Sequence, residues 1–135
     1  MDEKAVIEWL EQIAKLDVQI NAKEDEIAKY MALATKMTAS ISGMPHGGGI
    51  SDKVGGNAVK LAELSKEKEA LEKQKDYIIK TLKKLPADEF GVLYREFALY
   101  MKQTEISHEM GFSRWTVWRI RNNALENLKK LLSIP

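Results

Sequence analysis

The chain has 135 residues, no cysteine, and 21 Lys and Arg residues against 20 Asp and Glu residues. This length fits one ordinary domain or two small ones, and the lack of cysteine excludes disulfides and thiol chemistry and suits a reducing cytosol. The sequence has neither an apolar run long enough to span a membrane nor a signal peptide, so we expect a cytoplasmic protein without a membrane partner. The net charge of +1 argues weakly against a nucleic-acid partner unless the charge is unevenly distributed.

Apolar residues recur every three and four positions from Asp2 to about Thr38, which predicts a long amphipathic helix. The residues of this stripe, with Leu10 and Met31 beside it, are Val6, Trp9, Ile13, Leu16, Ile20, Ile27, Tyr30, Ala34 and Met37. Such a helix is not stable alone, so we expect the stripe to be buried against a partner.

Six of the eight glycines lie between Gly43 and Gly56. Together with Pro45 they predict a flexible, non-helical connector over residues 41–56. A second amphipathic helix is expected from about Asn57 to Leu85. The apolar residues of its stripe are Val54, Leu61, Leu64, Leu71, Ile78, Leu82 and Leu85.

The first domain, residues 1–85, is therefore predicted to be an antiparallel coiled-coil hairpin. Its apolar residues spread too widely for one narrow partner, so we expect hairpins to associate into a dimer or higher homo-oligomer. The alternative is a monomeric hairpin packed against the C-terminal region.

Residues 86–135 differ in composition and form the predicted second domain. They hold all four arginines and seven of the ten aromatic residues. Within them, residues 86–110 have five acidic and two basic residues, whereas residues 111–135 have one acidic and five basic. The near-neutral total thus conceals a basic C-terminal segment, which removes the objection to a nucleic-acid partner.

The second domain is predicted to begin with a helix whose first residue is Pro86, after which the chain turns near residues 98–102. The residues of this helix expected to face a core are Phe90, Leu93, Tyr94 and Phe97. A short helix follows, capped by Gln103 or Thr104, with Ile106 and Met110 directed inward.

The next residues predict a helix-turn-helix. Gly111 is expected in a left-handed conformation, Phe112 fills the turn, and Ser113 caps the last helix. The inward residues of that helix are Val117, Ile120, Ala124, Leu128 and Leu131.

The opposite face of the last helix is the candidate DNA-binding surface. Two tryptophans exposed on one helix are costly unless a partner covers them, and arginine and asparagine match the groups that bases and phosphates present. The predicted DNA-binding residues are Arg114, Trp115, Thr116, Trp118, Arg119, Arg121 and Asn122. We expect Arg119 to select bases and Arg121, nearer the core, to support binding to all sequences.

This module resembles region 4 of sigma-70-type factors, the helix-turn-helix that binds the promoter −35 element. The match is carried by Leu85-Pro86, Glu105-Ile106-Ser107 and Met110-Gly111-Phe112-Ser113, and then by Val117, Arg119 and Ala124-Leu125, with Ser107 in place of the usual alanine. The resemblance implies base contacts by Arg114, Trp115 and Arg119.

A second resemblance lies in the stretch SGMPHGGGISDKVGGNAVKL. It is similar to a family of small prophage-encoded proteins of Gram-positive bacteria that join helical arms to a sigma-like module. The combination also resembles the ArpU- and RinA-type late transcription regulators of phages. These resemblances imply a DNA-binding regulator in the cytoplasm of a bacterial host.

We therefore expect a sequence-specific transcriptional regulator that binds double-stranded DNA and needs no cofactor. Two alternatives remain: a small terminase-like DNA-packaging component, and an interaction module that contacts RNA polymerase through its tryptophans. An enzyme is not expected. Glu105 and His108 have metal-ligand spacing but form only one pair, and the loop around His46 lacks the Gly-Lys-Ser/Thr ending of a phosphate-binding loop.

Overall fold

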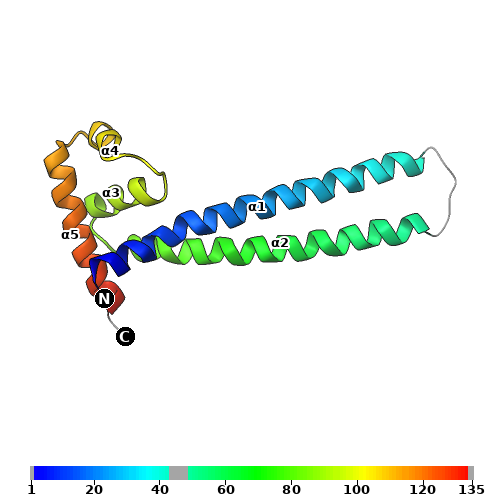
Figure 1. Ribbon diagram of the computed structural model, residues 1–135, viewed down its shortest axis with the longest axis horizontal. Coiled ribbons are helices and arrows are strands. Elements are labelled where there is room, and N and C mark those ends of the chain that lie inside the picture. The colour runs from blue at the N-terminus through cyan, green and yellow to red at the C-terminus, as the bar shows by residue number, and fades with distance from the viewer. Residues whose placement is uncertain (1, 43–48, 134–135) are drawn as a thin grey trace. The chain divides into compact units, whose positions relative to one another are not determined.

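The computed structural model describes residues 2–42 and 49–133, and every regular element in this part of the chain is an α-helix (Figure 1). The helices are α1 (Glu3–Ser42), α2 (Gly49–Leu82), α3 (Ala87–Phe97), α4 (Gln103–Met110) and α5 (Arg114–Ser133). The predicted all-α class is therefore confirmed. None of the described helices is both long and apolar enough to cross a lipid bilayer.

The chain divides into two compact units, and the division does not follow the predicted boundary after residue 85. The first unit joins residues 1–16 to residues 74–135, and the second unit comprises residues 17–73. The start of α1 and the end of α2 thus belong to the same unit as α3, α4 and α5. The sequence could not indicate this, because the apolar stripe of α1 continues unchanged through residue 16.

The second unit is the antiparallel hairpin that the two stripes predict (Figure 1). Lys23 Nζ lies 2.6 Å from Glu67 Oε2, and Lys68 Nζ lies 3.4 Å from Glu24 Oε1. The hydrogen bond to Lys23 lowers the pKa of the Glu67 carboxyl and raises the pKa of the Lys23 ammonium. These paired charges lie across the two helices of the hairpin and are consistent with the antiparallel pairing.

The glycine-rich connector is shorter than predicted. Helix α1 extends to Ser42 and α2 begins at Gly49, so residues 41–42 and 49–56 are helical. The remaining residues of the predicted connector, 43–48, lie outside the described residues. Glycine lowers helix stability by about 1 kcal/mol without breaking the backbone hydrogen bonds, and adding a turn to an existing helix is far easier than nucleating one.

The first unit has a core made by α3, α4 and α5. Val92 of α3, Ile106 of α4, and Val117 and Ile120 of α5 are buried together, and Met101 packs against them. The helix periodicity correctly places Ile106, Val117 and Ile120 inside, together with Ala124 and Leu128.

Of the four residues of α3 predicted to face the core, Leu93 is confirmed, but the deepest part of the helix differs from the prediction. Val92 and Leu93 are fully buried, whereas Phe90, Tyr94 and Phe97 are half-buried. The rings of Phe90 and Tyr94 stack with centroids 5.3 Å apart. Two large rings at this spacing cover the edge of the core, while the smaller aliphatic side chains fill its interior.

The beginning of α3 also differs by one residue. Pro86 is the N-cap, with ψ of 153°, and Ala87 is the first helical residue. The Pro86 carbonyl accepts a hydrogen bond of 2.9 Å from the Phe90 N–H. Asp88 and Glu89 lie in the first turn, where their charge complements the helix dipole.

The arm segments of the first unit are well buried. Val6, Leu10 and Ile13 of α1 have no exposed surface, and neither has Leu82 of α2. Because one helix cannot cover its own side chains to this degree, other segments of the same unit must cover them.

Candidate nucleic-acid interface

Helices α4 and α5 meet at a turn with the predicted helix-turn-helix features. Gly111 has φ of 72°, the left-handed conformation that ends α4, and its N–H donates to Ser107 O at 3.0 Å. The Phe112 N–H donates to the same carbonyl at 3.2 Å, and the Ser107 hydroxyl donates to Phe112 O. Ser107, in place of an alanine, thus fixes the turn through its side chain as well as its backbone.

Two details of this region differ from the prediction. Phe112 does not fill the turn, because 37% of its surface is exposed. The N-cap of α4 is Lys102 rather than Gln103 or Thr104. The Lys102 N–H donates to Glu105 Oε1 at 3.0 Å, so a carboxylate in the first turn supplies the cap.

Ser113 caps α5 as predicted. Its hydroxyl oxygen accepts a hydrogen bond of 3.1 Å from the Thr116 N–H and lies 2.9 Å from the Thr116 hydroxyl. The Val117 N–H donates to Ser113 O at 3.0 Å. The N–H groups of Arg114 and Trp115 have no acceptor within the helix, which makes this helix end attractive to an anion.

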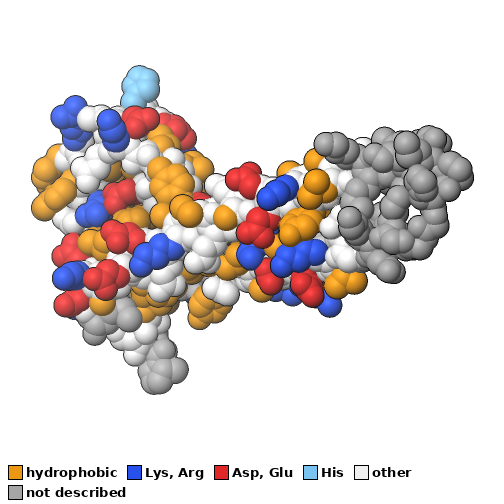
Figure 2. Space-filling model, turned by 45° about the vertical axis from the view of Figure 1, so that its right-hand side comes forward, with side chains coloured by type: hydrophobic (Ala, Val, Ile, Leu, Met, Phe, Trp, Pro, Cys, Tyr) orange, Lys and Arg blue, Asp and Glu red, His pale blue; other side chains and the backbone are white. Residues whose placement is uncertain are grey.

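The first two turns of α5 carry two large exposed aromatic residues. Trp115 and Trp118 are 64% and 52% exposed, and Arg114 and Arg119 are also exposed. The guanidinium carbon of Arg119 lies 5.2 Å from the centroid of the Trp115 ring, a cation–π contact. Figure 2 shows hydrophobic side chains at the molecular surface among charged ones.

The N-terminal part of α5 is free of negative charge. Residues 110–125 contain no Asp or Glu, and this stretch includes Arg114, Arg119 and Arg121. Nothing on the exposed first two turns therefore opposes the approach of a polyanion. We define the recognition face as Arg114, Trp115, Trp118 and Arg119.

Two predicted residues lie at the border of the recognition face. Thr116 and Asn122 are half-buried. The Thr116 hydroxyl is engaged with Ser113, so its main role is in the cap.

Arg121 lies outside the recognition face because it pairs with Glu96, and its predicted role as a DNA contact stays a prediction. Its Nε lies 2.7 Å from Glu96 Oε1, and its terminal nitrogen donates to Glu96 Oε2 at 3.0 Å. Both side chains are 19% exposed. This fork-shaped pair joins α5 to α3, and the guanidinium donors that would meet a phosphate already face a carboxylate.

The polar contacts that hold the three helices together were not predicted from the sequence. Besides Glu96, Asn127 Nδ2 of α5 donates to Glu89 Oε1 of α3 at 2.7 Å. Arg95 of α3 donates from Nε to Glu109 Oε1 of α4 at 3.0 Å. The acidic character of residues 86–110 was the only signal, because it implied carboxylates available to pair with bases elsewhere.

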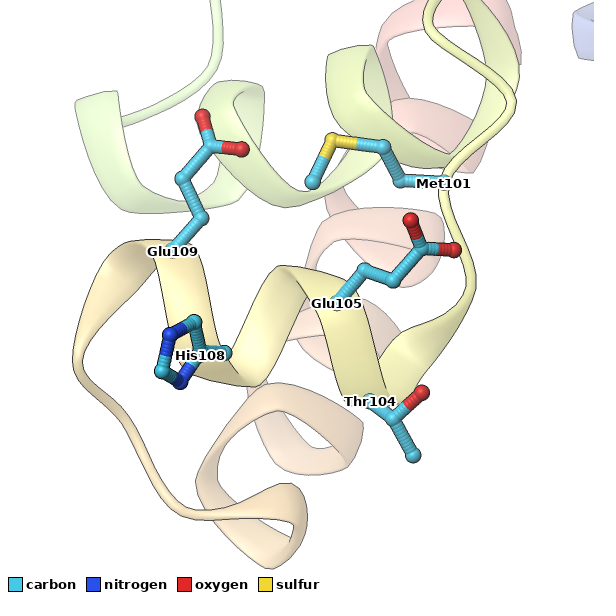
Figure 3. Close-up of a pocket in the computed structure, with 5 residues that line it drawn as sticks. All are labelled: Met101, Thr104, Glu105, His108 and Glu109. Atoms are coloured by element: carbon cyan, nitrogen blue, oxygen red, sulfur yellow. The ribbon is translucent and has the colours of Figure 1, made fainter.

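A pocket of about 540 Å³ lies beside α4, away from the turn. Met101, Thr104, Glu105, His108 and Glu109 line it (Figure 3). Glu105 and His108 are the pair with metal-ligand spacing, but Glu105 accepts the α4 cap hydrogen bond. In the described part of the chain, no group of three or more His, Cys, Asp or Glu side chains is placed to hold a metal ion.

Comparison with known proteins does not assign the chain to a family. No family model, no curated protein and no solved structure matches it. The chemistry of the recognition face must therefore carry the functional argument.

Proposed function

We propose that the chain is a sequence-specific DNA-binding transcription regulator encoded by a phage or prophage, and that α5 enters the major groove with the recognition face toward the bases. One observation carries the proposal. Trp115, Trp118 and Arg119 are exposed together on the helix that follows a helix-turn-helix turn. Such a helix is the element that enters the groove in this class of protein.

The chemistry of the face fits duplex DNA. An arginine donates two hydrogen bonds to guanine O6 and N7, and an aromatic ring can cover a thymine methyl or a sugar. Arg114, at the first position of α5, lies where backbone phosphates would meet the helix N-terminus. Covering two tryptophans with a partner also removes the cost of leaving them in water.

The resemblance to sigma region 4 and to phage late regulators supports the regulatory role. The turn residues Gly111 and Ser113, on which that resemblance partly rests, adopt the conformations that the motif requires. Contact with RNA polymerase is not needed for DNA binding and is left as an alternative use of the same tryptophans.

The hairpin supports self-association of this regulator. Among the described side chains of the second unit, Ile20 and Leu64 are the buried hydrophobic ones. Met31, Leu33 and Val59 are 56%, 40% and 60% exposed, so apolar surface remains for a second copy. A dimer in light scattering supports a regulator on paired half-sites, whereas a closed ring of many subunits favours the packaging alternative.

Selection of bound duplexes from a random pool tests the proposal. We expect enrichment of a defined site, and its affinity should fall steeply as salt rises, because bound phosphates release counterions. An unenriched pool would overturn the proposal.

Arg119→Ala then tests the recognition face on the selected site. It should reduce discrimination at one base pair by about 1–3 kcal/mol, as expected for loss of a two-bond arginine–guanine contact. Lys73→Ala is the matched control, since it removes one positive charge from the hairpin, where the Lys73 side chain is 75% exposed. If both variants bind every duplex as the wild type does, the recognition face is wrongly assigned.

A further inference from the structure

Trp115 and Arg119 form a single preassembled group on the surface of α5. They are one helical turn apart, and the guanidinium carbon of Arg119 lies 5.2 Å from the Trp115 ring centroid. The indole is 64% exposed even with this contact in place. The arginine is therefore restrained before any ligand arrives, and the ring still has a large apolar surface to offer.

The spacing of the pair can be compared with the spacing of bases. Guanine is the base whose major-groove edge matches the arginine fork. Successive base pairs are stacked roughly 3.4 Å apart, so a ring centred 5.2 Å from the guanidinium carbon reaches base pairs no more than two steps from that guanine. One side-chain pair thus spans a short run of bases rather than a single one.

The apolar ring selects among the groups it meets there. Of the groups that base pairs present in the major groove, the C5-methyl of thymine is the apolar one, and the others are hydrogen-bond donors or acceptors. The face of an indole has no donor for these acceptors. Covering a methyl gains free energy, whereas covering an amino or carbonyl group without a hydrogen bond costs free energy.

From this geometry we propose that Trp115 and Arg119 together recognise a guanine with a thymine within two base pairs of it, Arg119 bonding the guanine edge and Trp115 covering the thymine methyl. The inference rests on the proposed function and adds the base composition of the preferred site. It also makes Trp115 a specificity-determining residue whose effect can be separated from that of Arg119.

The test uses the duplex enriched from the random pool, with single bases altered so that Watson–Crick pairing is kept. Each thymine is replaced in turn by deoxyuridine, which lacks only the methyl, and each guanine by 7-deazaguanine, which lacks the N7 acceptor. The guanine whose 7-deaza form weakens binding by the wild type but not by Arg119→Ala marks the arginine contact. Affinities are measured by fluorescence anisotropy at one fixed salt concentration.

One deoxyuridine within two base pairs of that guanine should weaken binding by the wild type about fourfold, the effect of one buried methyl group. Trp115→Ala should bind the thymine and deoxyuridine duplexes equally. Trp118→Ala removes the other exposed tryptophan of the recognition face, so it should lower the affinity for both duplexes but retain the fourfold difference between them.

Two results would overturn the inference and leave the proposed function standing. The first is a wild type that does not distinguish thymine from deoxyuridine within two base pairs of the guanine. The second is a methyl effect that persists in Trp115→Ala, which would place another group on that methyl. A pool with no enriched duplex would instead remove the proposed function, and this inference with it.

Discussion

Removing the Glu96 charge tests whether the ion pair with Arg121 holds α5 against α3. Glu96→Gln keeps the size and shape of the side chain but removes its charge. Three hydrogen bonds, at 2.7, 3.1 and 3.0 Å, join the two side chains. In the variant the amide can accept at one atom only, so the Arg121 guanidinium is left with unpaired donors in a largely covered position.

The burial of the pair sets the size of the effect. Exposed pairs contribute roughly 0–1 kcal/mol, and removing one partner of a fully buried pair costs about 3–5 kcal/mol. Both side chains here are 19% exposed, so we expect Glu96→Gln to destabilise the first unit by about 2 kcal/mol. Arg121→Met should cost a similar amount, and the double variant should cost less than the sum of the two, with a coupling energy of about 1–2 kcal/mol.

Tryptophan fluorescence during urea unfolding provides the assay. All three tryptophans, Trp9, Trp115 and Trp118, belong to the first unit, so their emission follows that unit and not the hairpin. The four proteins of the double-mutant cycle are compared by their midpoints at constant slope. A coupling energy below about 0.3 kcal/mol would refute the reasoning, because it would show that this ion pair does not hold α5 against α3.

Three further predictions concern single positions. Gly111→Ala should destabilise the first unit by about 1–2 kcal/mol, because φ of 72° is unfavourable for a residue with a Cβ. Gly56→Ala should instead stabilise the hairpin by up to about 1 kcal/mol, because Gly56 is helical and an added Cβ would meet open space. Stability changes of the same sign for the two variants in urea unfolding would contradict this prediction. Ser113→Ala should cost about 1 kcal/mol by removing the α5 cap, and Ser113→Asp should not, so equal losses in the two variants would argue against the cap. Lys23 lowers the pKa of the Glu67 carboxyl, so the charged carboxylate stabilises the fold above its ordinary pKa, and this stabilisation is lost as the pH falls through the lowered pKa. Glu67→Gln should therefore have a slightly lower thermal midpoint than the wild type at pH 7 and low salt. A difference in thermal midpoint that persists in strong acid would count against the ion pair.

Prediction from the sequence was most accurate at positions where the backbone conformation favours one type of residue. Gly111 fits a left-handed residue and Ser113 fits a helix cap, and both lie as expected. The inward face of α5 also followed from spacing alone, because Val117, Ile120 and Ala124 repeat with the period of the helix.

The errors arose where the outcome depends on contacts distant in sequence. Periodicity defines an apolar stripe on α3 but not which part of the stripe is most deeply buried. The burial of Val92 was therefore not predicted, and the burial of Phe90 was overestimated. The pairing of Arg121 with Glu96 joins residues 25 positions apart, and no local rule connects them. The ion pair of Arg121 consequently could not be predicted from its position on the helix.

The discontinuous composition of the first unit has a consequence for synthesis on the ribosome. Residues 1–16 emerge first, but the segments that cover Val6, Leu10 and Ile13 begin only at residue 74. At roughly 5–20 residues per second, this leaves their apolar side chains uncovered for about 3–12 seconds. The hairpin can pair during that interval, so the unit with the recognition face closes last, and a nascent chain that stops before α5 exposes an apolar surface to chaperones and proteases.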